Sequence, residues 1–172
     1  LYEIREAVMA ACEAAPSIPV IASMTFTRDD RTLLGDTPQT VARALAEANA
    51  DVIGVNCSGG PAQIFRIIKQ MRAAVGANLV GQTHSSGKEE KSSPYLSAMP
   101  NAGWPEQVGG RIMYPANPAY FGDYAQAFCE LGVSVIGGCC GTTPQHIAAM
   151  RQSLDREPEG CSPLLQEVTE IA

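Results

Sequence analysis

Apolar and polar residues follow one repeated pattern along the chain. An apolar, β-branched run leads into a short loop, then a proline, and then a segment with the apolar spacing of a helix. The runs cover residues 18–26, 51–57, 95–103 and 132–140, and the helical segments cover 39–50, 62–75, 119–131 and 145–154. A further amphipathic helix is predicted over 1–15. The runs are continuously apolar, which is typical of parallel strands buried on both faces of a sheet.

Each of the four repeated helices is predicted to begin at a proline, because the fixed φ of proline suits the first helical position and its missing N–H costs nothing there. The prolines are Pro38, Pro61, Pro118 and Pro144, and the expected N-caps are Thr37, Asn117 and Thr143. Successive β–α units predict an α/β fold. The pattern leaves two arrangements open: a doubly wound open sheet, or half of a (β/α)₈ barrel of about 250 residues. No G-x-G-x-x-G motif follows a strand, so a dinucleotide-binding fold has no support.

Composition restricts the function classes. The chain is 45% hydrophobic and 17% charged, which suits a packed core. The net charge is −6 and the Lys and Arg residues are scattered, so a nucleic-acid partner is not expected. No apolar run reaches the roughly 18 residues that a bilayer requires. With no signal-like start, we expect a cytoplasmic, reducing location, where cysteines are metal ligands, nucleophiles or core residues rather than disulfides.

Two segments fall outside the repeated pattern. Residues 76–94 are polar and predict a surface loop, in which 78–82 could form a short strand. Residues 155–172 predict a linker or tail, which leaves 1–154 as the domain. The acidic pair at 29–30 is expected on the solvated surface.

Cysteines close two of the predicted strands: Cys57 ends the second run, and Cys139 and Cys140 end the fourth. Because functional groups gather at the carboxyl ends of parallel strands, we expect these three thiols at one rim. Zinc accepts three thiolates and keeps a fourth tetrahedral position open for a substrate. The sequence therefore predicts a zinc site.

Glycines flank these cysteines: Gly137, Gly138 and Gly141 on one side, Gly59 and Gly60 on the other. We expect them to let the backbone leave strand geometry through positive φ angles, so that both adjacent sulfurs reach one ion.

Other readings of the cysteines stay open at this point. They could be small buried hydrophobes, or Cys139 and Cys140 could form a vicinal disulfide or serve a thiol redox protein. The remaining cysteines, Cys12, Cys129 and Cys161, are interpreted as ordinary structural residues. His146 is expected to pack or cap in the first turn of its helix, and His84 falls in the polar loop.

The motifs "GVNCSGGP", "MPNAGWP" and "GGCCGTTPQHI", in that order, together with "ASMTF" and "GDTP", resemble the homocysteine S-methyltransferase family up to about residue 154. The cysteine motifs are specific, and their form is similar to the homocysteine modules of cobalamin-dependent methionine synthase and of bifunctional enzymes fused to a methylenetetrahydrofolate reductase. The resemblance implies a (β/α)₈ barrel, of which this chain supplies the C-terminal half, strands five to eight.

The resemblance also implies a zinc-dependent transfer of a methyl group to the homocysteine thiol, which forms methionine. Cys57, Cys139 and Cys140 match the family's zinc ligands, and Asn101 falls in its substrate-binding loop. The methyl donor would be methylcobalamin, recharged by methyltetrahydrofolate, on another module; S-methylmethionine and betaine are alternative donors. The expected partners are homocysteine, the missing N-terminal half or a second copy, and a cobalamin, folate or reductase module. The alternative is an incomplete barrel that holds zinc, or acts as a scaffold, without turnover.

Overall fold

The computed structural model describes residues 1–76 and 93–155. The predicted surface loop and its short strand fall almost entirely outside these residues, as does the predicted tail. The helices are α1 (Tyr2–Ala14), α2 (Pro38–Glu47), α3 (Pro61–Val75), α4 (Pro118–Glu130) and α5 (Pro144–Asp155). The strands are β1 (Ile21–Met24), β2 (Val52–Cys57), β3 (Tyr95–Pro100), β4 (Glu106–Val108), β5 (Arg111–Met113) and β6 (Val135–Ile136).

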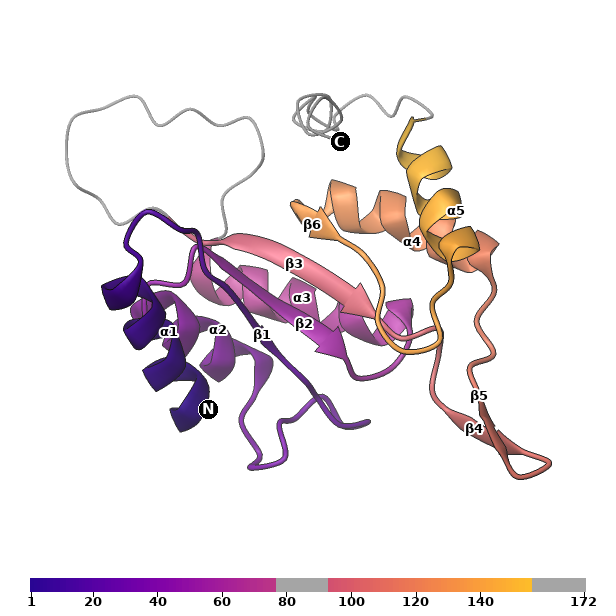
Figure 1. The fold of residues 1–172 in the computed structure, drawn as a ribbon, viewed down its shortest axis with the longest axis horizontal. Helices are drawn as coiled ribbons and strands as arrows, with labels where there is room; N and C mark the ends of the chain where they lie inside the picture. Colours follow the sequence, from indigo (N-terminus) through magenta and orange to yellow (C-terminus); the bar gives the residue numbers. More distant parts are fainter. Residues whose placement is uncertain (77–92, 156–172) are drawn as a thin grey trace.

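The main sheet has four parallel strands in the order β1-β2-β3-β6, so the strands that alternate with helices lie side by side in sequence order. Successive helices also pack against one another, α2 on α3 and α4 on α5 (Figure 1). A doubly wound sheet would reverse its strand order. The uninterrupted order instead supports the half-barrel arrangement.

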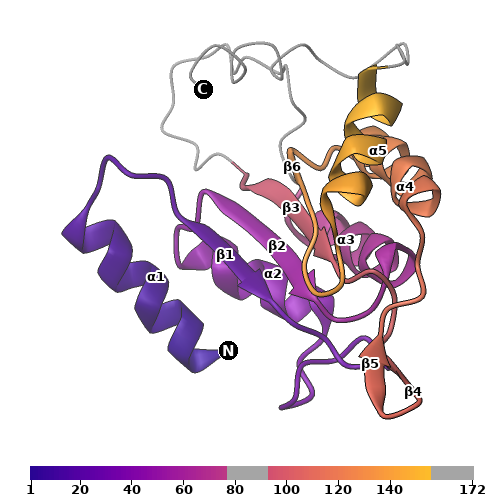
Figure 2. The same cartoon turned by 45° about the vertical axis from the view of Figure 1, so that its right-hand side comes forward.

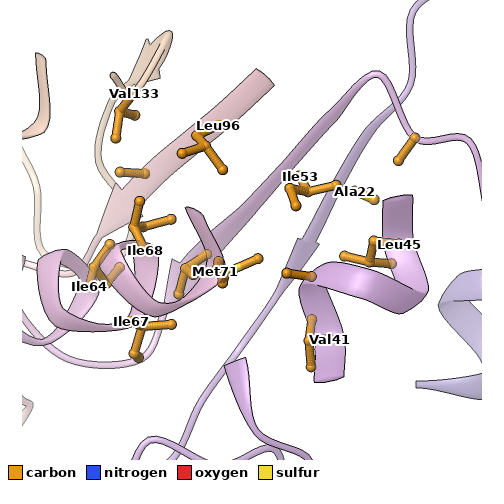
Figure 3. Close-up of a cluster of buried hydrophobic side chains, with 14 of the residues drawn as sticks. Ala22, Val41, Leu45, Ile53, Ile64, Ile67, Ile68, Met71, Leu96 and Val133 are labelled. Carbon is orange, nitrogen blue, oxygen red and sulfur yellow. The ribbon is translucent and has the colours of Figure 1, made fainter. Parts of the chain in front are cut away.

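The core lies between the sheet and the helices α2 and α3. In Figure 3 the labelled strand residues of this core lie above the labelled residues of the helices. The strands supply Ala22, Ile53 and Leu96, and the helices supply Val41, Leu45, Ile64, Ile67, Ile68 and Met71. Nearly all of these are fully buried, which explains why the central strands are continuously apolar in the sequence.

The predicted helix starts are confirmed. The proline stands in the first helical positions of α2, α3 and α4, and α5 begins at Pro144. The side chain of Thr37 accepts a hydrogen bond from the Thr40 N–H, and that of Asn117 accepts one from the Tyr120 N–H. At α5 the cap is built differently, because Nδ1 of His146 accepts the Thr143 N–H at 3.1 Å.

An antiparallel hairpin, β4–β5, interrupts the long loop that the sequence predicted between β3 and α4, and it projects from the body of the molecule (Figures 1 and 2). Its strands have three residues each, all exposed, so they carry no buried apolar run. The turn residues Gly109 and Gly110 have φ angles of 56° and 78°, as a tight two-residue hairpin turn requires.

Candidate metal centre

Cys57 is the last residue of β2, and the backbone is strained there. Cys57 and Ser58 have φ angles of 56° and 58°, a left-handed region that side chains other than glycine rarely adopt. The Ser58 hydroxyl accepts a hydrogen bond from the Phe26 N–H at 2.8 Å, which fixes this turn to the loop after β1. The hydrogen bond from the loop after β1 therefore holds Ser58 in this strained conformation.

The second cysteine loop, residues 137–143, follows β6 and returns to the carboxyl ends of β2 and β3 (Figures 1 and 2). The Cys139 N–H donates to the Pro100 carbonyl at 2.8 Å, and the Cys140 carbonyl accepts from the Ala102 N–H at 2.9 Å. The Thr142 hydroxyl donates to the Cys139 carbonyl at 2.6 Å. The loop is thus bound to the end of β3, between the two strands that supply cysteines.

The expected role of the glycines is wrong at four of five positions. Of these glycines, Gly141 alone has a positive φ, of 77°. Gly137 and Gly138 are needed for space instead, because a Cβ would lie 2.6 Å from the Met99 sulfur in one case and 2.5 Å from the Thr142 side chain in the other. Beside Cys57, the unusual φ angles fall on the cysteine and serine themselves rather than on the glycines that follow.

The three predicted thiols converge. The Cys57 sulfur lies 3.2 Å from that of Cys139 and 3.7 Å from that of Cys140, and the two adjacent sulfurs are 3.9 Å apart. All three are free thiols, half-buried or exposed. Because a disulfide needs about 2.05 Å between sulfurs, this arrangement contains no bond between them and leaves all three available as ligands.

Proximity changes the acidity of these thiols in opposite directions. Burial, together with the neighbouring Cys139 and Cys140 thiols, raises the pKa of Cys57 to about 12. Burial also opposes ionisation of Cys139, but hydrogen bonds from Cys57 and Cys140 outweigh it and lower the pKa of Cys139. The cluster therefore favours one thiolate, which accepts hydrogen bonds from the neighbouring thiols. Ionisable groups in such close contact titrate together, so ionisation of one raises the pKa of the others.

Asn101, the predicted substrate contact, connects the two cysteine loops. It is only 5% exposed. Its Oδ1 accepts the Cys140 N–H at 3.0 Å and its Nδ2 donates to the Ser58 carbonyl at 3.1 Å. Its own N–H donates to the Gly59 carbonyl at 3.1 Å. This bridging position could not be read from the sequence, and contact with a substrate stays a prediction.

Tyr114 is a neighbour of the cluster that sequence reasoning missed. It follows β5, and burial and then the Cys140 thiol raise the pKa of its hydroxyl. The only sequence signal was its place before a proline in the segment leading to α4.

The remaining candidates lie elsewhere. Cys12 and Cys129 are in α1 and α4 and do not belong to the cluster. Cys129 forms a disulfide, so the expectation that the cysteines avoid disulfides is wrong at this position. Cys161 and His84 lie outside the described residues. His146 is buried, with Nε2 donating to the Ala116 carbonyl at 3.0 Å, which confirms packing and capping. Asp30 is not simply a solvated surface residue, because it forms an ion pair with Arg66 at 2.6 Å. Within residues 1–76 and 93–155, no helix has the length and apolar character that crossing a membrane requires.

Comparison with known proteins gives this site its context. A family model described as homocysteine S-methyltransferase matches residues 1–154. The chain belongs to the homocysteine S-methyltransferase family. The methionine synthase of Mycobacterium leprae (strain TN) is 29% identical over 168 residues, or 95% of this chain, and that of Mycobacterium tuberculosis (strain ATCC 25618 / H37Rv) is 30% identical over 152 residues, or 86%. The chain spans only 12% and 11% of these relatives.

Solved structures of the homocysteine methyltransferase MmuM from Escherichia coli share the fold. The oxidized form has a TM-score of 0.56 at 23% identity, and the match covers 86% of this chain and 40% of that one. The apo form has a TM-score of 0.55 at 22% identity, with 87% and 45% covered. At this identity the likeness establishes the fold alone, and the described sheet matches part of the (β/α)₈ barrel of those structures.

Proposed function

We propose that this chain binds zinc through Cys57, Cys139 and Cys140 and presents homocysteine, as its thiolate, for methylation to methionine. The observation that carries the proposal is the convergence of three sulfurs from two loops at the carboxyl rim of the sheet. Family membership supports homocysteine as the substrate.

The spacing of the sulfurs fits a tetrahedral ion. With Zn–S bonds of about 2.3 Å, two ligands of a tetrahedral zinc lie about 3.8 Å apart. The separations between the sulfurs in the structure, 3.2, 3.7 and 3.9 Å, are close to this value. Three thiolates are also the soft donor set that selects zinc over magnesium or calcium.

The chain's own residues determine how the substrate sulfur behaves. A thiol with a pKa near 8.5 is mostly protonated at neutral pH, and bound Zn²⁺ supplies the chemistry that removes this proton from a coordinated thiol. Three cysteinates and a substrate thiolate carry more negative charge than the ion neutralises, so the substrate sulfur stays electron-rich. Three neutral imidazoles would leave the site positive and the thiolate a weaker nucleophile.

In the proposed reaction the homocysteine sulfur forms a bond to the methyl carbon while the bond from that carbon to the donor breaks, and its electron pair leaves with the donor. The relatives named methionine synthase favour methylcobalamin on another module, recharged by methyltetrahydrofolate. The described sheet leaves β1 and β6 each paired on one side only. We propose that the other half of a barrel, or a second copy of this chain, completes the sheet at these strands.

The test is metal content and turnover in matched variants of this chain. Purified with zinc, the protein should hold one ion, and Cys140→Ala should lose it. Cys12→Ala, which removes a free cysteine outside the cluster, should keep it. Stoichiometric zinc in the Cys140→Ala protein would refute the assignment. Zinc binding without methionine formation from homocysteine and methylcobalamin, even beside the complementary half, would favour the scaffold alternative.

A further inference from the structure

A cavity of about 540 Å³ lies between the loop after β1 and the first turns of α3 and α4. Its walls include Arg28, Gly60, Gln63, Arg66, Trp104 and Tyr120. Gly60 follows Cys57 by three positions, yet none of the three cluster thiols lines the cavity. A volume of this size is typical of sites for small organic molecules, which occupy roughly 300–1,000 Å³.

The charged side chains on the cavity wall are both positive. Arg28 and Arg66 are the charged residues among the described ones that line it, although the whole chain has a net charge of −6. Within residues 1–76 and 93–155, Arg28 has no carboxylate partner. Arg66 uses Nε and one terminal nitrogen on Asp30, at 2.6 and 2.8 Å, which leaves its second terminal nitrogen for a ligand. Because guanidinium groups bind carboxylates and phosphates through paired N–H bonds, the cavity favours an anion.

The same wall offers flat surfaces. The Arg28 guanidinium is stacked on Trp104, with its Cζ atom 4.5 Å from the ring centroid. A guanidinium stacked in this way keeps the N–H groups at its edge free for an anion. Tyr120 adds a second aromatic ring to the wall. Aromatic rings and arginine planes are the surfaces on which heterocyclic bases stack, so the wall suits a planar ring.

Gln63 holds an unused acceptor at this wall. It is only 5% exposed, and its Nε2 donates to the Thr27 carbonyl at 2.7 Å and to Oδ1 of Asp30 at 3.0 Å, which fixes the orientation of the amide. Its Oε1 has no hydrogen-bond partner among the described residues. A Cβ at Gly59 would clash with this oxygen and with Nε1 of Trp104, so the oxygen points toward the indole that lines the cavity. A buried acceptor without a partner is costly, and an N–H group of a ligand would satisfy it.

We propose that this cavity binds a planar heterocyclic anion, in which a ring with N–H donors is joined to a phosphate or a carboxylate. The anionic group pairs with Arg28 and Arg66. The ring stacks against Arg28 and Tyr120, and its N–H groups face Oε1 of Gln63. Nucleoside monophosphates have this chemistry with a phosphate, and pteroylglutamates have it with carboxylates. The site uses none of the clustered thiols, so the inference does not rest on the proposed function.

The test observes Trp104 directly, because the single tryptophan of the chain gives one indole N–H signal in a nuclear magnetic resonance spectrum. AMP and folic acid are titrated separately into the full chain, and calorimetry measures their affinity. We expect at least one of them to bind with a Kd below about 1 mM and to shift the indole signal. Which of the two binds distinguishes a phosphate ligand from a carboxylate ligand. The uncharged rings, adenosine and pterin, and inorganic phosphate alone should each bind at least roughly tenfold more weakly.

Variants of the exposed arginine locate the site. Arg28→Ala should weaken binding roughly tenfold or more, and Arg28→Lys, which keeps the charge but loses the planar fork, should fall between that variant and the wild type. Arg43→Ala, which removes an exposed arginine of α2 outside the cavity, should bind as the wild type does. The inference is overturned if neither AMP nor folic acid binds, if binding leaves the indole signal unmoved, or if Arg28→Ala binds as tightly as the wild type. Each of these results leaves zinc binding and methyl transfer untouched.

Discussion

Replacing Asn101 with alanine tests how the two cysteine loops are held together. The substitution removes both side-chain hydrogen bonds of a residue that is 5% exposed, at 3.0 Å to the Cys140 N–H and 3.1 Å to the Ser58 carbonyl. Water cannot easily replace a partner at this depth. A buried polar group left without a partner costs about 1–3 kcal/mol.

Two such groups predict that Asn101→Ala lowers the free energy of unfolding by about 2–6 kcal/mol, a large part of the roughly 5–15 kcal/mol of a typical domain. Urea unfolding followed by circular dichroism measures this loss. Fluorescence of the single tryptophan, Trp104, reports unfolding of the loop after β3, which also contains Asn101. Gln39→Ala is the matched control, because its amide donates one bond to Gln70 near the surface, and it should cost under about 1 kcal/mol.

The same variant should weaken zinc binding by roughly 10- to 100-fold, because the loops that present Cys57 and Cys140 lose their connection. A loss of stability below that of the control, with zinc affinity unchanged, would refute this reasoning. If that variant instead raised only the KM for homocysteine, Asn101 would act as the substrate contact that the sequence predicted.

Two further predictions concern the backbone and an ion pair. Gly141→Ala should lower the free energy of unfolding much more than Gly110→Ala. Both glycines have φ near +77°, but a Cβ at Gly141 would meet Tyr114 whereas a Cβ at Gly110 would meet open space. Equal unfolding free energies of the two variants would contradict the close packing. Arg66 and Gln63 lower the pKa of Asp30 despite its burial, so this carboxylate stabilises the fold above its ordinary pKa of 3.8 and loses that effect as pH falls through its lower folded value. The stability difference between wild type and Asp30→Asn, at most about 1 kcal/mol for a pair with an exposed arginine, should therefore be full at pH 7 and vanish in acid; a difference that grows in acid would refute this.

The repeated unit was predictable because it is local. Continuous apolar runs predict buried parallel strands, and a proline after a capping residue predicts a helix start, so both could be read without knowing the rest of the fold. The meeting of Cys57 with Cys139 and Cys140 followed from one topological rule, that parallel strands end at the same edge. The hairpin β4–β5 was missed because its strands are exposed and only three residues long.

The details of the site depend on long-range contacts that leave little trace in a sequence. Asn101 bridges residues about forty positions away on either side, and Tyr114 packs on Gly141 only because the segment before α4 folds back. The glycine expectation failed for the same reason. A glycine indicates either an unusual φ or a close neighbour, and only the neighbours in space, such as Met99 beside Gly137, decide between the two.

The most direct test of the proposed centre is zinc X-ray absorption of the purified chain, with and without homocysteine. Convergence of the three thiols predicts three sulfur ligands near 2.3 Å and one lighter ligand in the protein alone, becoming four sulfurs when homocysteine is added. Fewer than three sulfurs in the protein, or a first shell unchanged by homocysteine, would contradict it.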